Sequence, residues 1–285
     1  MRNLTSFLLI LFCFAIVLTA QEEAPPVTLH RTEVYKLESK TNGFTYPVYV
    51  ALPGSYSFTD QTYPVVYMLD GYSSFGIMVE EQRLLAFSKE VPEVIIVGIS
   101  SEGGSKEFIY NRSRDYTPTH IPPEQLPEAV RMMTPASGGA EKFLGFIKDE
   151  LIPFIESKYR CKKDDRTFVG HSYGGLFGFY VLFNQPDVFN RYVMVSPALL
   201  WDNELILKQE KEFAEKHESL DKVVYTTIGS LEGPFMIDPW KRLVASIKEH
   251  NYNGLQLKDE IAEGETHYTI IPFIVTHGLK YVFAK

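Results

Sequence analysis

A serine between two glycines stands where a strand pattern meets a helix pattern. The motif Gly170-His171-Ser172-Tyr173-Gly174 follows a short strand-like run at 166–170 and precedes a helical pattern at 174–183. A sharp strand-to-helix turn lifts the serine oxygen above the sheet, and small residues two positions away let strand and helix approach closely. This placement favours a nucleophile over a glycine-rich turn without chemistry. We therefore predict that Ser172 attacks a carbonyl carbon.

A serine hydroxyl is a poor nucleophile near pH 7, so the site needs a general base. In strand-to-helix turns of this kind, an acid and then a histidine follow the serine along the chain. His217, His250, His267 and His277 all lie downstream. Only His267 lies in a loop between the last predicted strand and the last predicted helix, whereas the others lie in or beside helical segments. We predict His267 as the base.

The acid that orients the base is expected after the strand at 223–228. Glu232 lies in the loop that follows this strand. Asp238 is the alternative, although just before Trp240 it could instead cap the helix predicted there. A serine and histidine pair without an acid is the third possibility. We predict Glu232.

An ester-cleaving serine also needs two donors for the oxyanion of the tetrahedral intermediate. The amide of Tyr173 lies at the start of the helix after Ser172, where backbone N–H groups are free. The strand ending at Leu69 is followed by a turn at Asp70 and Gly71, which could present the amide of Tyr72. Tyr72 and Tyr173 are the predicted oxyanion hole.

Three further side chains are candidates for contact with a substrate or with the loop around it. Arg112 could bind a substrate carboxylate or phenolate, or anchor its loop through Asp115, and for Arg114 we favour that structural role. Trp201 could form a pocket wall or pack in the core. The sequence contains no HExxH, paired CxxC, P-loop or GxGxxG motif, so it predicts neither a metal nor a cofactor.

The elements that position these residues alternate between strand and helix along most of the chain. Two early strands joined through Asn42-Gly43 predict an antiparallel start, and the apolar runs that follow are typical of parallel strands covered on both faces. A long proline-rich loop with a short helix inside it is predicted at 115–139, and Pro153 predicts a kink in the helix at 140–159. The predicted strands are 32–37, 46–52, 64–69, 94–99, 166–170, 192–195, 223–228 and 255–261, and the predicted helices are 75–89, 140–159, 174–183, 240–251 and 270–283.

This order predicts a doubly wound, mostly parallel α/β sheet with an antiparallel N-terminal start. The length of 285 residues allows one large core. Residues 1–20 have a basic start, an apolar run and small residues before Gln21, as in a signal peptide. We predict a cleaved leader at 1–20, a single domain at 21–285 and a periplasmic or secreted protein, with an uncleaved membrane anchor as the alternative.

The net charge and the cysteine content limit the binding partners and the disulfide bonds that this chain can have. The net charge is −8, and loss of Arg2 with the leader makes it more negative by one. Acidic proteins are poorly suited to nucleic acid and to anionic membrane surfaces, so we predict a small-molecule ester as partner. Cleavage after Ala20 would also remove Cys13 and leave Cys161 without a disulfide partner within the chain.

Several segments of the chain carry a resemblance to known proteins, and they are residues 67–71, 112–118, 138–153, 170–178, 195–197 and 201. They resemble the esterase family of the α/β-hydrolase superfamily, which includes enterobactin-type siderophore esterases, feruloyl esterases, S-formylglutathione hydrolases and, more remotely, antigen 85 acyltransferases. The resemblance implies an α/β-hydrolase fold without a separate lid domain and ester hydrolysis without a cofactor. It places the nucleophile on Ser172, the base on His267 and the oxyanion amides on Tyr72 and Tyr173.

Together these observations predict an exported serine carboxylic-ester hydrolase that forms an acyl-enzyme on Ser172, with activation by His267 and Glu232. An acyltransferase of the antigen 85 type would share this chemistry and replace water with another acceptor. A non-catalytic binding protein on a hydrolase scaffold is the alternative from another class, and the presence of Ser172, His267 and a candidate acid argues against it. The cytosolic substrate of S-formylglutathione hydrolases does not suit an exported protein.

Overall fold

The computed structural model describes residues 27–284, and from Arg31 onward the chain forms one compact unit. The predicted signal peptide at 1–20 lies outside the described residues. Within the described part, no helix combines the length and the apolar character that a membrane span requires.

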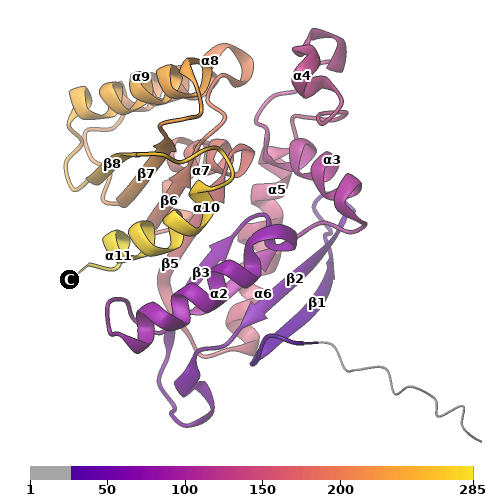
Figure 1. Ribbon diagram of the computed structural model, residues 1–285, viewed down its shortest axis with the longest axis vertical. Helices are drawn as coiled ribbons and strands as arrows, with labels where there is room; N and C mark the ends of the chain where they lie inside the picture. The colour runs from indigo at the N-terminus through magenta and orange to yellow at the C-terminus, as the bar shows by residue number, and fades with distance from the viewer. Residues whose placement is uncertain (1–26, 285) are drawn as a thin grey trace, which may run out of the picture. The chain divides into compact units, whose positions relative to one another are not determined.

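One sheet of eight strands forms the centre of this unit (Figure 1). The strand order is β1-β2-β4-β3-β5-β6-β7-β8, with antiparallel pairing of β1 with β2 and of β2 with β4, and parallel pairing elsewhere. This confirms the predicted antiparallel start and the parallel remainder. The strands are Thr32–Glu38 (β1), Thr45–Ala51 (β2), Tyr63–Met68 (β3), Ile95–Ile99 (β4), Cys161–His171 (β5), Arg191–Val195 (β6), Val223–Gly229 (β7) and Gln256–Ala262 (β8).

Helices cover both faces of the sheet. One layer packs on β2, β4, β6 and β7, and consists of α2 (Gly71–Phe87), α10 (Ile270–Phe273), a π-helical turn at Ile274–Gly278 and α11 (Leu279–Val282). The other layer contains α3 (Ser105–Tyr116), α5 (Ala140–Phe146), α6 (Ile152–Lys158), α7 (Tyr173–Asn184), α8 (Trp201–Ala214) and α9 (Pro234–His250). Strands β3 and β4 are therefore buried on both sides, as their continuous apolar runs predict.

Aromatic side chains fill the space between the sheet and the second helix layer. Phe177 of α7 lies at the centre, with its ring 5.3 Å from Phe143 and 5.9 Å from Phe168. Tyr46 of β2 stacks on Phe146 at 4.4 Å. These rings are almost completely buried, and such clusters give a rigid support to the turn that begins α7.

The helix predicted at 140–159 is interrupted by a π-helical turn at Ile147–Leu151 between α5 and α6. Pro153 explains this turn, because proline has no N–H and its ring clashes with the carbonyl four residues earlier. The kink predicted at Pro153 therefore takes the form of a wider helical turn.

Two expectations about the second half of the chain need correction. Helix α9 begins at Pro234, six residues before the start predicted at Trp240, because Gly233 adopts a φ of 83° and Pro234 follows it in the first turn. Asp238 therefore lies inside the helix and does not cap it. Helix α8 was not among the predicted elements. The loop at 115–139 contains a short helix as predicted, α4 (Glu128–Arg131), together with a 3₁₀ turn at Pro123–Gln125.

Candidate active site

Ser172 lies at the carboxyl end of β5, where the chain turns into α7. Its φ and ψ of 61° and −118° are rare for a residue with a side chain, and its amide donates to the carbonyl of Val195 on the next strand (2.9 Å). A Cβ on Gly170 would lie only 2.3 Å from the carbonyl oxygen of Gly174, so the turn requires glycine there. The strain predicted for a nucleophile-bearing turn is present in the backbone.

The predicted oxyanion donors lie at the starts of two neighbouring helices. Tyr173 is the first residue of α7, and Tyr72 is the second residue of α2, which follows β3. Since β3 and β5 are adjacent and parallel, both helix starts lie at the same edge of the sheet. First-turn amides have no acceptor within their own helix, so both can donate to a ligand at this edge. Asp70 makes the turn into α2 with a left-handed φ of 57°.

His267 and Glu232 are in direct contact. The Nδ1 atom of His267 lies 2.7 Å from Oε2 of Glu232, and these side chains come from the loops after β8 and β7. Glu232 therefore orients the ring so that Nε2 is available to a proton donor. Within residues 27–284, no hydrogen bond joins Ser172 Oγ to His267. The ring of His171, the residue before Ser172, lies 4.6 Å from the ring of His267.

The Glu232 carboxylate is almost fully buried, with 1% of its side chain exposed. Its Oε1 accepts hydrogen bonds from the hydroxyl of Ser196 and from the amide of Gly229 (2.8 Å). Burial raises the pKa of Glu232, but the hydrogen bonds from His267, Ser196 and Gly229 outweigh it and hold the pKa below its usual value. Glu232 is thus a fixed carboxylate and a suitable acid for the imidazole.

The alternatives to these two residues lie elsewhere. Asp238 is on the exposed side of α9, and its charge acts on Arg242. His217 stacks on a phenylalanine at the end of α8, and His250 binds the buried carboxylate of Glu210 (2.7 Å). His277 stacks on Phe273, with ring centroids 3.8 Å apart. Of the four downstream histidines, His267 is the one that meets a carboxylate beside the serine turn.

Arg112 and Asp70 form an ion pair near the carboxyl ends of the parallel strands. Arg112 Nε and one Nη atom bind the two oxygens of Asp70 at 2.9 and 2.8 Å, and the same Nη reaches the carbonyl of His171 (3.2 Å). Arg112 therefore links the start of α2 to the serine turn. Its side chain is only 15% exposed, so direct substrate binding by Arg112 stays a prediction and the geometry favours a positioning role.

Arg114 and Trp201, the other two candidates for contact with a substrate, are bound to other residues of the protein. Arg114 forms a two-point ion pair with Asp115, with both distances 2.7 Å, as favoured from the sequence. Trp201 is 6% exposed, donates to the hydroxyl of Thr119 (3.0 Å) and packs edge-on against Tyr173 (5.7 Å). The structure favours packing for Trp201, and its contact with a substrate stays a prediction.

Sequence reasoning missed three residues of this site: His171, Ser196 and Asp70. His171 lies inside the serine motif, and its Nε2 bonds to the carbonyl of His267 (2.7 Å). Ser196 directly follows β6 and has a positive φ of 43°, which cannot be read from the sequence. Asp70 was noticed only as part of a turn, although a carboxylate at a strand end is a reasonable ion-pair candidate.

Large apolar side chains are exposed on the loops at the same edge of the sheet. They come from the connections after β3, β4, β6, β7 and β8, and Met132 and Tyr268 are exposed by 81% and 74%. Single exposed apolar residues are ordinary, but a set that shares one edge is typical of a binding surface. The set, called the apolar rim below, consists of Tyr72, Met132, Met133, Leu200, Leu231, Phe235 and Tyr268.

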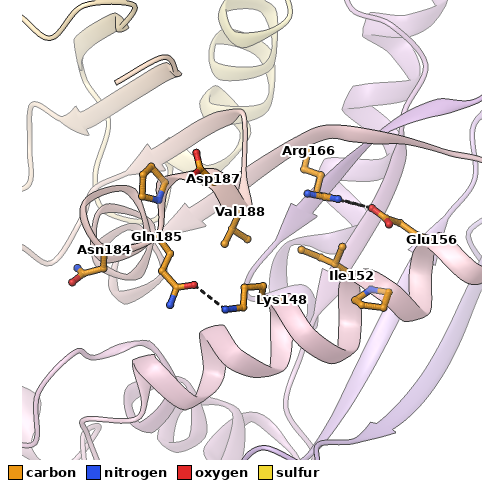
Figure 2. Close-up of a pocket in the computed structure, with 10 residues that line it drawn as sticks. Lys148, Ile152, Glu156, Arg166, Asn184, Gln185, Asp187 and Val188 are labelled. Carbon is orange, nitrogen blue, oxygen red and sulfur yellow. Dashed lines mark hydrogen bonds and ion pairs between the residues drawn. The ribbon is translucent and has the colours of Figure 1, made fainter. Parts of the chain in front are cut away.

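A hollow of about 580 Å³ lies at the opposite edge of the sheet (Figure 2). It is formed by the π-turn and α6 on one side and by the connection from α7 to β6 on the other. Figure 2 shows Arg166 bound to Glu156 and Lys148 bound to Gln185 across it. Arg166 precedes His171 by five strand residues, roughly 16 Å, so this hollow is remote from Ser172. No group of three or more metal-binding side chains is found among residues 27–284.

The strand order, the strained serine turn and the histidine on the last loop define an α/β-hydrolase. The family model described as "Putative esterase" matches residues 39–265, which is most of the chain. The chain belongs to this esterase family.

Individual relatives agree with this assignment. The chain is 33% identical over 265 residues to the ferri-bacillibactin esterase BesA of Bacillus subtilis (strain 168), with 89% of this chain and 90% of the relative covered. The BES protein from Bacillus cereus superposes with a TM-score of 0.79 at 30% identity, covering 92% of this chain and all of that one. An IroE-like serine hydrolase from Shewanella oneidensis gives a TM-score of 0.78 at 28% identity, covering 88% and 80%. This protein is a serine esterase-type hydrolase.

Proposed function

We propose that this esterase cleaves a carboxylic ester through an acyl-enzyme on Ser172, with His267 as general base and Glu232 as the acid that orients it. The observation that carries the proposal is the contact of His267 with the buried Glu232 carboxylate, on loops beside the strained turn at Ser172. A serine, a histidine and a carboxylate in this order are the parts that acyl transfer needs.

The reaction proceeds in two halves. In the first, Ser172 Oγ attacks the ester carbonyl while His267 Nε2 takes its proton, and the amides of Tyr72 and Tyr173 donate to the oxyanion. The intermediate collapses, the alcohol leaves with the proton from His267, and the acyl group stays on Ser172. In the second half, water attacks the acyl carbon while His267 takes its proton, and the intermediate then releases the acid as His267 gives that proton to Ser172 Oγ.

The substrate we propose is a small siderophore-type ester of low net charge. The named relatives include a ferri-bacillibactin esterase, and the apolar rim suits aryl or alkyl groups on either side of the ester. The charge of Arg112 is paired with Asp70, so Arg112 provides little net attraction for a strongly anionic ferric complex. An iron-free ester is therefore the better match to this site.

A panel of esters tests the proposal. Purified protein lacking residues 1–20 is assayed with a short p-nitrophenyl ester, a feruloyl ester, and an iron-free trilactone and its ferric form. We expect turnover of the trilactone that is lost in Ser172→Ala, and a lower kcat/KM for the ferric form. Turnover that persists in Ser172→Ala would contradict the assignment of the nucleophile. Transfer of the acyl group to an added alcohol in preference to water would indicate an acyltransferase.

We also propose that residues 1–20 are a cleaved signal peptide and that residues 21–285 form a single exported domain. The basic start, the apolar run and the small residues before Gln21 support this. The intact mass of the protein recovered from the culture medium or the periplasm should correspond to a chain that begins at Gln21. A mass that retains Met1 would contradict cleavage.

A further inference from the structure

His171 is a partly buried polar side chain that the proposed mechanism does not use. It ends β5 one residue before Ser172, and its Nε2 lies 2.7 Å from the backbone carbonyl oxygen of His267. The two residues are 96 positions apart in the chain, so this hydrogen bond joins the serine turn to the base loop directly.

The partner of this hydrogen bond fixes the tautomer of His171. A carbonyl oxygen can only accept, so Nε2 of His171 must carry the proton and donate it. Burial lowers the pKa of His171 to about 3, with further contributions from the positive charges of His267, when protonated, and of Arg112. The Glu232 charge and the hydrogen bond to His267 act in the opposite direction. His171 is therefore a neutral donor at any pH at which the esterase would work.

The contacts of the His171 Nε2–H group indicate that it holds the loop that carries His267. Glu232 holds the ring of His267 at Nδ1, and the amide of Leu231 holds the same loop at the carbonyl of Glu265 (3.0 Å), two residues earlier. His171 holds the carbonyl of His267, while Arg112 holds the carbonyl of His171 and links it to Asp70 before the oxyanion donor Tyr72. These hydrogen bonds join His171, the residue before Ser172, both to His267 and, through Arg112, to Asp70, two residues before Tyr72.

We propose that His171 is a positioning residue for this esterase: its Nε2–H group fixes the backbone of the base loop at the distance from Ser172 that proton transfer requires. The inference rests on the proposed function, because it assumes that Ser172 and His267 are the nucleophile and the base. It extends that function by assigning a role to the variable position inside the serine motif.

Two substitutions of similar length separate the hydrogen bond from the volume of the side chain. In His171→Gln, the amide nitrogen can take the place of Nε2 and donate, whereas His171→Met fills a similar space without a donor. A small hollow of about 20 Å³ beside His171 gives both side chains some room. Each variant is assayed for kcat, KM and the pH profile of kcat/KM on one soluble ester, and for the rate at which diisopropyl fluorophosphate phosphorylates Ser172.

We expect His171→Met to lower kcat and the phosphorylation rate about tenfold with KM changed less than about twofold, which is the effect of losing one buried hydrogen bond to a reacting geometry. His171→Gln should stay within about threefold of wild type. A Met variant with the wild-type kcat would overturn the inference, and so would a Gln variant as slow as the Met variant, because the donor would then be irrelevant.

Folding is checked by circular dichroism and thermal melting. If His171→Met does not fold, His171→Asn replaces it, since the Asn amide is too short to reach the His267 carbonyl, and the same comparison with Gln applies. A wild-type protein that hydrolyses no ester of the panel would mean that the proposed function has failed. Active wild type with equal rates in all variants would mean that only the role of His171 has failed.

Discussion

The two carboxylate oxygens of Glu232 have different hydrogen-bond partners. Oε2 contacts the imidazole of His267, while Oε1 accepts hydrogen bonds from Ser196 and from the Gly229 amide. The second set of bonds stabilises the charged form of a buried group and fixes its orientation. A carboxylate held in this way can stabilise the imidazolium that forms during catalysis without taking its proton.

Two matched substitutions test which carboxylate is the acid. Glu232→Gln should lower kcat/KM by up to about 10⁴-fold, because the ring of His267 loses both its orientation and its compensating charge. Asp238→Asn should leave kcat/KM within about twofold, because Asp238 is exposed on α9. Steady-state kinetics on one soluble ester measure both. Equal and small losses would instead support a dyad of Ser172 and His267.

The pH dependence of activity should reflect a single group. His267 must be neutral to accept the proton from Ser172, so kcat/KM should rise with pH along one limb. His171 and Glu232 should not add a second rise to the pH profile of kcat/KM. The pKa of His171 is lowered to about 3, and the pKa of Glu232 lies below its usual value. His267→Ala should remove the limb with nearly all activity, whereas His277→Ala should keep both. Loss of the limb in His277→Ala alone would place the base on the last helix.

The loops that carry Glu232 and His267, the proposed acid and base, meet at the end of β7. A Cβ on Gly229 would lie 2.3 Å from the carbonyl oxygen of Glu265, two residues before His267. The amide of Leu231 donates to the same carbonyl (3.0 Å). The approach of strand and base loop is therefore set by the absence of a side chain at Gly229.

Gly229→Ala should shift the base loop away from the serine turn. We expect kcat/KM to fall at least about tenfold, while overpacking at one loop costs about 1–3 kcal/mol of the free energy of unfolding. Gly104→Ala is the matched control, because a Cβ there would meet only a carboxylate oxygen of Glu107 at 3.5 Å. Kinetics and thermal melting of both variants give the comparison. Wild-type kcat/KM in Gly229→Ala would show that the base loop tolerates this displacement.

The buried, neutral His171 beside charged groups should make the free energy of unfolding of the whole protein depend on pH. In the unfolded chain His171 takes up a proton near its ordinary pKa of 6.5, but in the folded protein only near 3. Between these values the unfolded state binds more protons, so the free energy of unfolding falls as the pH is lowered. The loss from His171 should be about 1 kcal/mol for each pH unit below 6.5.

Urea unfolding at pH 7, 6 and 5 measures this loss. His171→Gln should show a shallower decrease in the free energy of unfolding than wild type, because glutamine does not titrate. His277→Gln serves as the control for the loss of a histidine at an exposed position. Equal slopes in wild type and His171→Gln would mean that His171 takes up its proton at the same pH in the folded and the unfolded protein.

Much of the fold could be predicted from local patterns. Strands β3 and β4 are apolar runs buried on both faces, and their bounds differ from the prediction by one residue at most. The start of α9 was misplaced because the Gly233-Pro234 signal was passed over in favour of Trp240. Chain order was enough to predict that His267 and Glu232 lie near each other, since each follows a strand of the parallel sheet, and the two side chains are in contact.

Contacts between residues far apart in the chain could not be predicted from the sequence. Arg112 has an acidic neighbour in Asp115, yet its ion pair is with Asp70, 42 residues earlier. Ser196 and Glu232 are 36 residues apart, and their hydrogen bond depends on how β6 and β7 lie side by side. Such pairs leave no local periodicity, because only the sheet brings them together.

Covalent labelling tests the central claim most directly. Diisopropyl fluorophosphate phosphorylates an activated serine, with fluoride leaving and the serine proton passing to the base. Intact mass and peptide mapping should show one phosphoryl group, carried by the peptide that contains Ser172, and its appearance should match the loss of esterase activity. The label should be absent in Ser172→Ala and should form at least about 10²-fold more slowly in His267→Ala. A label on another residue, or full activity in protein labelled at Ser172, would contradict the account.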